Sequence, residues 1–450
     1  MMYVPFPSVS SQQQVKTLSP LSTAECCRVD SLPSQALVDV NRFVIEMHAD
    51  RPILRINASN RKNPILDLRT GQVIPAFSKT ELIQQSEGAY AFLFDPNDVV
   101  STQWIDQDQW TVTNFYDVDR PLLKVSFIDD TALYFSSTRG HLAQLTTQTQ
   151  RTWSWFGAIP HWLYPQLLRQ HDKLWENVVI ALSLLGVFLT VFGLYLGVVK
   201  YRRLPSGRHS PYRGVALWHH YVGLVFGLLV LTWVGSGLLS MNPWQLFQLG
   251  GGKLEREALT GVPLASSDVE QFIRRLPSLP IPENTKRLEG YALSGKLEIL
   301  AVSDTGVQRL NAEDLSPNPL TSDEWQRLIN KVSLERKIRH VDTLNEADGY
   351  YYNHHSTRYF PVQRVVLDDE QSTRLYLHGE SGELVGYFDR DNRWYRWLFS
   401  GLHQMDFASW LRVRPVWDIV VWFLLIGVSI ATLTGSYLGI KRLVRGRGKA

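Results

Sequence analysis

The chain has 450 residues, of which 44% are hydrophobic, with 46 lysines and arginines against 43 aspartates and glutamates. Because the small cationic excess is concentrated in two short runs, the charge argues against a nucleic-acid-binding face. The sequence also has no Ser-His-Asp pattern and no zinc-protease motif. It has no phosphate-binding glycine loop and no dinucleotide fingerprint, which argues against a flavin or nicotinamide half-reaction within the chain.

The first part of the chain, after a polar stretch over residues 1–40 without a signal peptide, predicts an α+β fold. The sequence predicts a tight turn at Asp67 to Gly71 and a helix at Ser78 to Gln85. The stretches LLKVSFIDD and ALYFSS alternate apolar and polar residues, which is typical of half-buried antiparallel strands. These elements predict a small layer of helices on a sheet.

A similar set of elements occurs in the second half of the chain. Thr321 to Val332 predicts a helix in which Thr321 or Ser322 is the N-cap. VQRVVLDD and TRLYLHG predict two more strands, and Glu380 to Gly382 a turn. We therefore expect a second α+β domain like the first.

Three uncharged stretches are long enough to cross a bilayer as helices: Val178 to Val199, Val215 to Met241 and Ile419 to Ile440. Each stretch carries a Gly-x-x-x-Gly pair, which lets helix backbones approach closely in lipid. The pairs are Gly193 with Gly197, Gly223 with Gly227, and Gly435 with Gly439. The sequence predicts an α-helical membrane bundle; the pairs either only mediate packing or also leave room for a flat cofactor.

Basic runs beside the spans predict the topology. Lys200, Arg202, Arg203, Arg208 and Arg213 lie between the first two spans, and a second run follows Ile440. By the positive-inside rule both runs are cytoplasmic. The two large polar segments then lie on the outer side, which is the periplasm of a Gram-negative cell.

The chain contains an internal repeat. Residues 151–200 recur at residues 393–442 with a constant interval of 242, so that His161 matches His403. A repeat of this length indicates a duplicated unit that ends in a membrane helix. The same interval places a counterpart of the second span just before residue 1, so we expect a fourth span there.

Two histidines lie within the second span. An intramembrane imidazole is costly without a partner, which makes His219 and His220 functional candidates. Adjacent helical positions point about 100° apart, so we expect only one of them to face the bundle. His220 shares a stripe with Gly223 and Gly227, which favours it as the inward residue and as a haem-iron ligand. The alternatives are a hydrogen bond from His220 to a backbone carbonyl, and a His219 side chain that extends to the lipid headgroups.

The repeat-related pair His161 and His403 lies among clustered tryptophans, which mark a membrane interface. We expect both surrounding segments to lie flat on the periplasmic surface. The two imidazoles could face one porphyrin from opposite sides, or each could pair with another helix; the alternative is a hydrogen-bonding role. His354 and His355 are weaker candidates for holding a metal or a bound chelate, because their stretch of the sequence favours a solvated loop.

Four motifs resemble the PepSY-associated transmembrane helix family: GAIPHWLY, SGLHQMDF, WHHYVGLVFGLL and the two Gly-x-Tyr-x-Gly helix ends. The similarity covers most of the chain from about Arg42 onward. It implies two PepSY-like periplasmic domains and four spans in the bacterial inner membrane. Some members are iron-regulated, haem-binding reductases of ferric siderophores. This chain departs from the pattern because it lacks the first span, which puts a complete cofactor site in doubt.

The expected fold is therefore a membrane α-helical bundle with two α+β PepSY-like periplasmic domains, built by internal duplication. The expected parts are periplasmic domain 1 (1–173, interfacial over 151–173), a span (174–200), a cytoplasmic loop (201–213), a span (214–241), periplasmic domain 2 (242–415, interfacial over 393–415), a span (416–440) and a cytoplasmic tail (441–450).

Two functions follow as hypotheses. In the first, His161, His219, His220 and His403 are the candidate residues for one or two b-type haems, and the protein moves electrons across the membrane to a periplasmic acceptor such as a ferric siderophore. The haem would be non-covalent, because the chain has no Cys-x-x-Cys-His motif. In the second, the outer domains bind peptides or restrain a periplasmic protease, and the histidines are structural.

Overall fold

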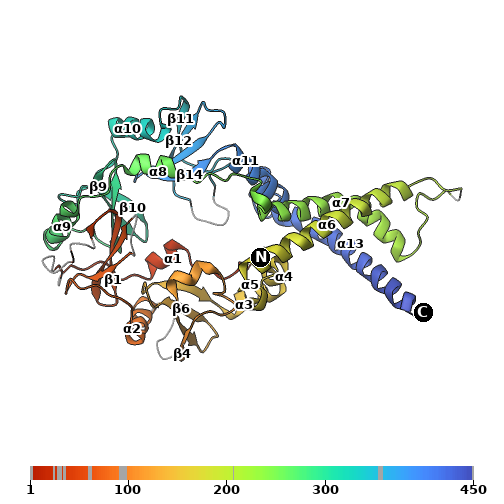
Figure 1. Cartoon of the computed structure of the whole chain (residues 1–450), viewed down its shortest axis with the longest axis horizontal. Helices are drawn as coiled ribbons and strands as arrows, with labels where there is room; N and C mark the ends of the chain where they lie inside the picture. The colour runs from red at the N-terminus through yellow and green to blue at the C-terminus, as the bar shows by residue number, and fades with distance from the viewer. Residues whose placement is uncertain are drawn as a thin grey trace. The chain divides into compact units, whose positions relative to one another are not determined.

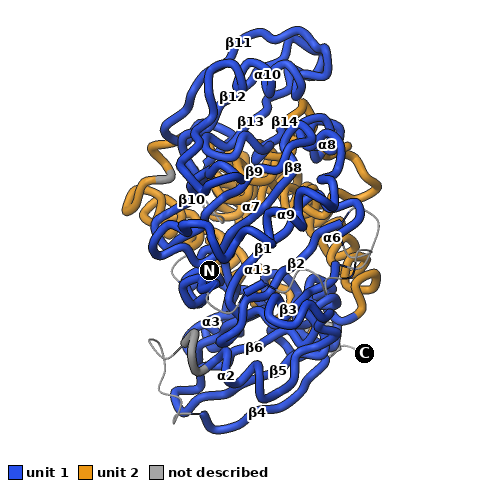
Figure 2. The backbone as a smooth tube through the Cα atoms, turned by 90° about the vertical axis from the view of Figure 1, so that its left-hand side faces the viewer, with its two compact units in different colours: residues 1, 3–170, 251–387 blue, residues 2, 171–250, 388–450 orange. Residues whose placement is uncertain are grey.

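The computed structural model describes residues 4–23, 26–27, 33, 37–58, 63–90, 99–205, 207–352 and 358–447. The chain forms two compact units (Figure 2). Unit 1 comprises residues 3–170 and 251–387, and unit 2 comprises residues 171–250 and 388–450. Of the sequence candidates, His354 and His355 lie outside the described residues.

A six-stranded antiparallel sheet in unit 1 has the order β10-β9-β8-β1-β2-β3. Its strands are β1 (Val40–His48), β2 (Arg51–Ala58), β3 (Ile65–Asp67), β8 (Arg287–Leu293), β9 (Lys296–Ser303) and β10 (Gly306–Leu310). At its centre β1 pairs with β8, so that Glu46 lies opposite Arg287. Strands from both outer segments therefore share one sheet, which the sequence analysis did not predict.

Two four-stranded antiparallel sheets complete unit 1, and each joins its strands in chain order. One contains β4 (Val99–Ile105), β5 (Leu122–Phe127), β6 (Ala132–Ser136) and β7 (Leu142–Thr146). The other contains β11 (Ile338–Leu344), β12 (Val362–Leu367), β13 (Arg374–His378) and β14 (Leu384–Phe388). The four strands expected from alternating residues are confirmed as β5, β6, β12 and β13. Their apolar side chains, such as Leu123 and Leu375, are fully buried in separate cores.

The predicted helices of unit 1 are confirmed as α2 (Lys79–Tyr90) and α10 (Ser322–Ser333). Thr321 is the N-cap of α10 and forms a capping box with Glu324, because its extended backbone places Oγ1 beside the amide of Glu324. Three short helices precede unit 2: α3 (Gln148–Phe156), α4 (Ala158–Trp162) and α5 (Gln166–Arg169). The remaining helices of unit 1 are α1 (Ser11–Lys16), η4 (Asn114–Asp119), α8 (Lys253–Thr260), α9 (Ser266–Arg275) and η6 (Leu276–Ser278).

Unit 2 contains three helices that are long and apolar enough to cross a membrane: α6 (Asp172–Lys200), α7 (Val215–Ser240) and α13 (Val416–Arg447). They confirm the three predicted spans, and by this criterion the chain is a membrane protein. The helix α7 packs against both α6 and α13 (Figure 1). The shorter elements of unit 2 are η5 (Pro243–Gln245), α11 (Arg390–Arg396), the π-helix η7 (Trp397–Gly401), α12 (Leu402–Gln404) and η8 (Ser409–Arg412).

One glycine of each Gly-x-x-x-Gly pair packs closely on a neighbouring helix. A Cβ atom built on Gly197 would lie 2.9 Å from Leu224, one on Gly227 would lie 2.6 Å from Leu194, and one on Gly435 would lie 2.9 Å from His219. The other members of the pairs, Gly193, Gly223 and Gly439, have no described atom within 4 Å of that position. The packing role is therefore carried by one position of each pair.

Candidate functional site

The imidazole of His219 contacts α13. Its Nδ1 lies 3.2 Å from the carbonyl oxygen of Ala431 and 3.2 Å from Oγ1 of Thr434. A carbonyl oxygen can only accept a hydrogen bond, so Nδ1 carries the proton of the neutral ring. The lone pair is then on Nε2, which makes no hydrogen bond to any described residue. This is the arrangement of a metal-ligating histidine whose orientation is fixed through Nδ1.

His220 has a different environment, on the side of α7 that faces α6. The residue is 6% exposed, its Nε2 lies 2.8 Å from the carbonyl oxygen of Gly197, and its Nδ1 lies 2.8 Å from Oγ of Ser210. The carbonyl again fixes the proton, here on Nε2, so Nδ1 accepts a hydrogen bond from the Ser210 hydroxyl. Both ring nitrogens are thus engaged, and His220 adopts the hydrogen-bonding alternative.

The expectation that only one of these two histidines can face the bundle is wrong. His219 contacts α13 and His220 contacts α6. The angle between adjacent helical positions is unchanged, but α7 has a neighbour on two sides, so two directions about 100° apart both point into the bundle. His219 does not extend to the lipid headgroups, because its ring is held by Ala431 and Thr434.

His403 contacts the other end of α7. It lies in α12, directly after the π-helix η7, and its Nδ1 is 3.1 Å from the carbonyl oxygen of Trp233 and 3.2 Å from Oγ of Ser236. The carbonyl contact places the proton on Nδ1 and the lone pair on Nε2, as in His219. A single-turn π-bulge inside a helix is frequent at functional sites. The ring also stacks on Phe399, with centroids 5.3 Å apart.

An ion pair closes the turn that carries His403. Arg396 and Asp406 are both buried, and the guanidinium Nη2 lies 3.5 Å from the carboxylate of Asp406. The two residues flank η7 and α12, so their attraction holds the ends of this turn together. The buried charge pair has no equivalent in the first copy of the repeat, where Ser154 and Tyr164 occupy the matching positions.

His161 belongs to unit 1, whereas His219, His220 and His403 belong to unit 2. His161 lies in α4, and its side chain is exposed. The repeat-related histidines therefore differ in their local structure. His161 lies within a short α-helix, whereas His403 follows a π-helix and contacts the side of α7. Their common placement around one porphyrin stays a prediction.

The residues present fit a haem ligand role at two positions. His219 and His403 each place Nδ1 beside a backbone carbonyl oxygen, the contact that orients a ligating imidazole, whereas His220 would first have to break two hydrogen bonds. His219 and Trp233 are 14 positions apart in α7, which corresponds to a rise of about 21 Å along the helix axis. The two imidazoles thus contact opposite ends of the same helix.

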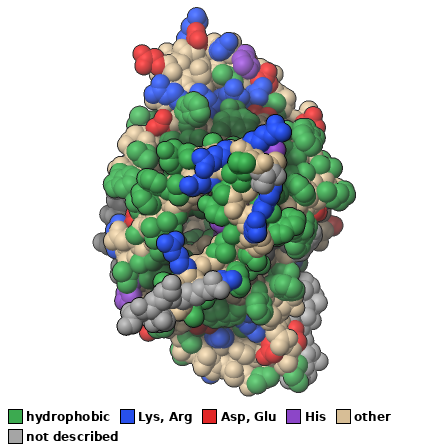
Figure 3. Space-filling model, turned by 90° about the vertical axis from the view of Figure 1, so that its right-hand side faces the viewer, with side chains coloured by type: hydrophobic (Ala, Val, Ile, Leu, Met, Phe, Trp, Pro, Cys, Tyr) green, Lys and Arg blue, Asp and Glu red, His purple; other side chains and the backbone are tan. Residues whose placement is uncertain are grey.

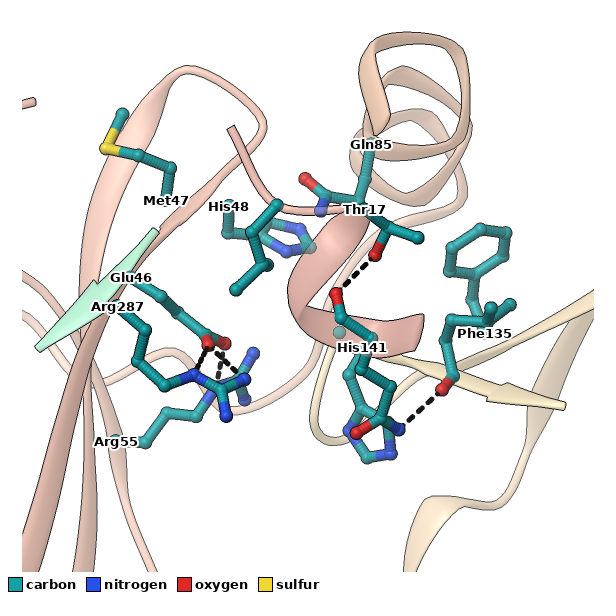
Figure 4. A pocket seen from close by; sticks show the side chains of 13 residues that line it. Thr17, Glu46, Met47, His48, Arg55, Gln85, Phe135, His141 and Arg287 are labelled. Carbon is teal, nitrogen blue, oxygen red and sulfur yellow. Dashed lines mark hydrogen bonds and ion pairs between the residues drawn. The ribbon is translucent and has the colours of Figure 1, made fainter. Parts of the chain in front are cut away.

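Sequence reasoning missed a buried polar cluster in unit 1 (Figure 4). Glu46 on β1 accepts from Arg55 Nε at 2.6 Å and from Arg287 Nε at 2.8 Å. Burial alone would raise the pKa of the Glu46 carboxyl, but these two guanidiniums lower it to about 2. The available signal was the ionisable pair Glu46 and His48 at the end of the strand VNRFVIEMH.

His48 is the unusual member of this cluster. It is 1% exposed, its ring lies 4.3 Å from that of Phe77, and neither ring nitrogen has a hydrogen-bond partner among the described residues. Burial, together with the positive charges of Arg55 and Arg51, lowers the pKa of His48 to about 3. The adjoining cavity has a volume of about 20 Å³, room for about one water molecule. The cavity is therefore too small for an organic ligand.

Comparison with known proteins gives no matching family model and no similar curated protein. The resemblance to the PepSY-associated family therefore stays a prediction.

Proposed function

We propose that this chain is an inner-membrane haem-binding protein that transfers electrons across the membrane to a periplasmic acceptor such as a ferric chelate or siderophore. The helices α6, α7 and α13 supply the membrane part. The haem would be b-type, because the chain has no Cys-x-x-Cys-His motif for covalent attachment.

The observation that carries the proposal is the contact of Nδ1 of His219 and of His403 with a backbone carbonyl oxygen. Each ring donates from Nδ1 to a backbone carbonyl of a neighbouring helix, at 3.2 Å and 3.1 Å. Such a hydrogen bond orients the ring and leaves Nε2 as the nitrogen that binds iron. Because the two rings contact opposite ends of α7, each would hold a separate haem.

Bound haem would supply one-electron chemistry, while this chain supplies its orientation and surroundings. Thr434 and Ala431 fix the ring of His219, and Ser236 and Trp233 fix the ring of His403. The ion pair between Arg396 and Asp406 holds the turn that presents His403.

We further propose that the protein arose by internal duplication and that its outer parts are PepSY-like and periplasmic. Matching polar triads support the duplication. Tyr134 donates to Asp108, which also pairs with Lys124, in one four-stranded sheet. In the other sheet Tyr376 donates to Asp348, which also pairs with Arg364.

The test is the visible spectrum of the full chain, purified in detergent from haem-replete cells. We expect a Soret band, and visible bands that sharpen on reduction by dithionite. His219→Ala and His403→Ala should each remove about half of the absorbance, because each change deletes one ligand. His340→Ala, at an exposed position on β11, is the matched control and should leave the spectrum unchanged.

A protein that folds but carries no haem under these conditions would refute the proposal. The alternative function would then be preferred, in which the outer domains sense peptides or regulate a periplasmic protease. Retention of full absorbance in both His219→Ala and His403→Ala would refute the ligand assignment alone.

A further inference from the structure

A dense group of cations lies in the connection between α6 and α7. It consists of Lys200, Arg202, Arg203, Arg208 and Arg213, which are exposed or half-buried. The sequence has no acidic residue between Glu176 and Glu255. None of the five cations forms an ion pair within the part of the chain that the structure describes. Their charge is therefore not neutralised by any carboxylate among the described residues.

The end of α13 adds to this group. The helix α7 runs antiparallel to both neighbours, since its first turns contact Gly197 near the end of α6 and Thr434 in the second half of α13. Lys441 and Arg442 follow Thr434 by two turns and are exposed. We call these seven cations the basic end of the bundle. Figure 3 shows Lys and Arg side chains gathered among hydrophobic ones on the face that includes it.

The loop that carries most of these cations is held in place by His220. Ser210 is 0% exposed, and its hydroxyl lies 2.8 Å from Nδ1 of His220. Tyr212 packs edge-on against the His220 ring at 5.3 Å, and its carbonyl oxygen accepts from Arg208 at 2.6 Å. The loop thus folds back on the ends of α6 and α7, which keeps its cations at the level where the apolar helices stop.

We propose that the basic end binds the phosphate groups of anionic lipids. The ends of bilayer-spanning helices lie at the depth of the lipid headgroups, and guanidinium groups bind phosphate oxygens in bidentate pairs. Tyr201 and Tyr212, which are 51% and 38% exposed, are residues typical of this interfacial depth. Each cation near an anionic surface strengthens binding roughly fivefold. The proposal does not depend on haem.

The experiment titrates the detergent-solubilised full chain with fluorescent phosphatidylglycerol, with phosphatidylcholine as the neutral lipid. We expect tight binding of the anionic lipid only. Replacing Arg202, Arg203, Arg208 and Arg213 by Gln should weaken it at least about tenfold. The matched control replaces Lys253, Arg256, Lys296 and Lys337, four exposed cations of unit 1, and should bind like the unchanged protein.

A second variant tests the role of the loop conformation. Ser210→Ala keeps every charge but removes the hydroxyl that holds the loop to His220, so it should weaken lipid binding by less than the four-residue change. If the four-residue variant does not fold, the salt dependence of the unchanged protein replaces it, because binding to exposed cations must weaken as salt is added.

Three results would overturn the proposal. They are equal affinity for the neutral lipid, unchanged binding by the four-residue variant, and binding of the anionic lipid that does not respond to salt. Competition by inorganic phosphate at concentrations similar to those of the lipid would assign the site to a soluble anion and also refute the lipid assignment. Haem content is measured in the same samples, so a failure here is separate from a failure of the proposed function.

Discussion

At the residue scale, the partners of each imidazole decide what it can do. His219 and His403 donate from Nδ1 to carbonyl oxygens, while His220 donates from Nε2 and accepts from Ser210 at Nδ1. Three histidines of the same bundle thus divide into two whose Nδ1 lies beside a carbonyl oxygen and one that joins a loop to a helix. The division depends on which nitrogen meets the carbonyl oxygen.

This division predicts the effect of His220→Ala. We expect the haem absorbance to be retained, because both ring nitrogens of His220 are already hydrogen-bonded. We also expect a loss of stability of about 1–3 kcal/mol, since the buried hydroxyl of Ser210 loses its partner. Thermal unfolding followed by circular dichroism measures the second effect, with His340→Ala as control. Loss of one haem signal in folded His220→Ala would show that His220 is a ligand after all.

Two histidines of unit 1, the buried His48 and the partly buried His141, predict a pH dependence of stability. Burial lowers the pKa of His48 to about 3 and that of His141 to about 4, below the usual 6.5. The unfolded chain therefore takes up protons first, so the stability contributed by the neutral rings is complete above pH 6.5 and is lost as the pH falls toward 4 and then 3. Glu46, with its pKa lowered to about 2, affects stability only below about pH 4.5.

The measurement is the denaturant midpoint of unit 1 between pH 7 and 4.5. The midpoint should fall as the pH is lowered. His48→Phe should reduce the dependence of the midpoint on pH, because an apolar ring beside Phe77 has no proton to take up. His340→Ala is again the exposed control. An unchanged slope in His48→Phe would show that His48 does not contribute to the acid sensitivity.

At the element scale, helix contacts depend on single glycines. A Cβ on Gly435 would lie 2.9 Å from the His219 ring, whereas one on Gly439 has no described atom within 4 Å. Gly435→Ala should displace the His219 ring, lower haem content and destabilise the bundle by about 1–3 kcal/mol, a typical cost of overpacking. Gly439→Ala lies on the same helix one turn later and should have little effect. Equal behaviour of the two variants in spectra and thermal unfolding would contradict the packing seen here.

The elements also show how far local sequence patterns reach. The alternating stretches that form β5 and β12, the cap Thr321 and the three spans were predictable because each is encoded within a few neighbouring residues. The pairing of β1 with β8 was not, since strands so far apart in the chain carry no local signal of their register. The orientation of His219 was missed for a related reason, because the number of neighbours of α7 is a property of the bundle.

At the scale of the whole molecule, the direction of the helices constrains the topology. The contacts of His220 with Gly197 and of His219 with Thr434 make α6 and α7 antiparallel, and likewise α7 and α13. The loop after α6 and the last turns of α13 therefore lie at the same end of the bundle. The basic residues at this end favour the cytoplasm.

Reporter fusions test this topology. A reporter inserted within residues 206–210 and one fused after Lys449 should both give a cytoplasmic signal, because antiparallel packing puts them on one side of the membrane and the positive charges retain them there. A reporter within residues 315–322, in the turn before α10, should give a periplasmic signal. Opposite signals from the first two fusions would contradict the antiparallel bundle, whereas matching periplasmic signals from both would keep the bundle and reverse its orientation. The hydrogen bonds of His219 and His220 thus determine the relative placement of the two reporters, whereas the cations of the basic end, which form no ion pair with a described residue, determine the absolute orientation.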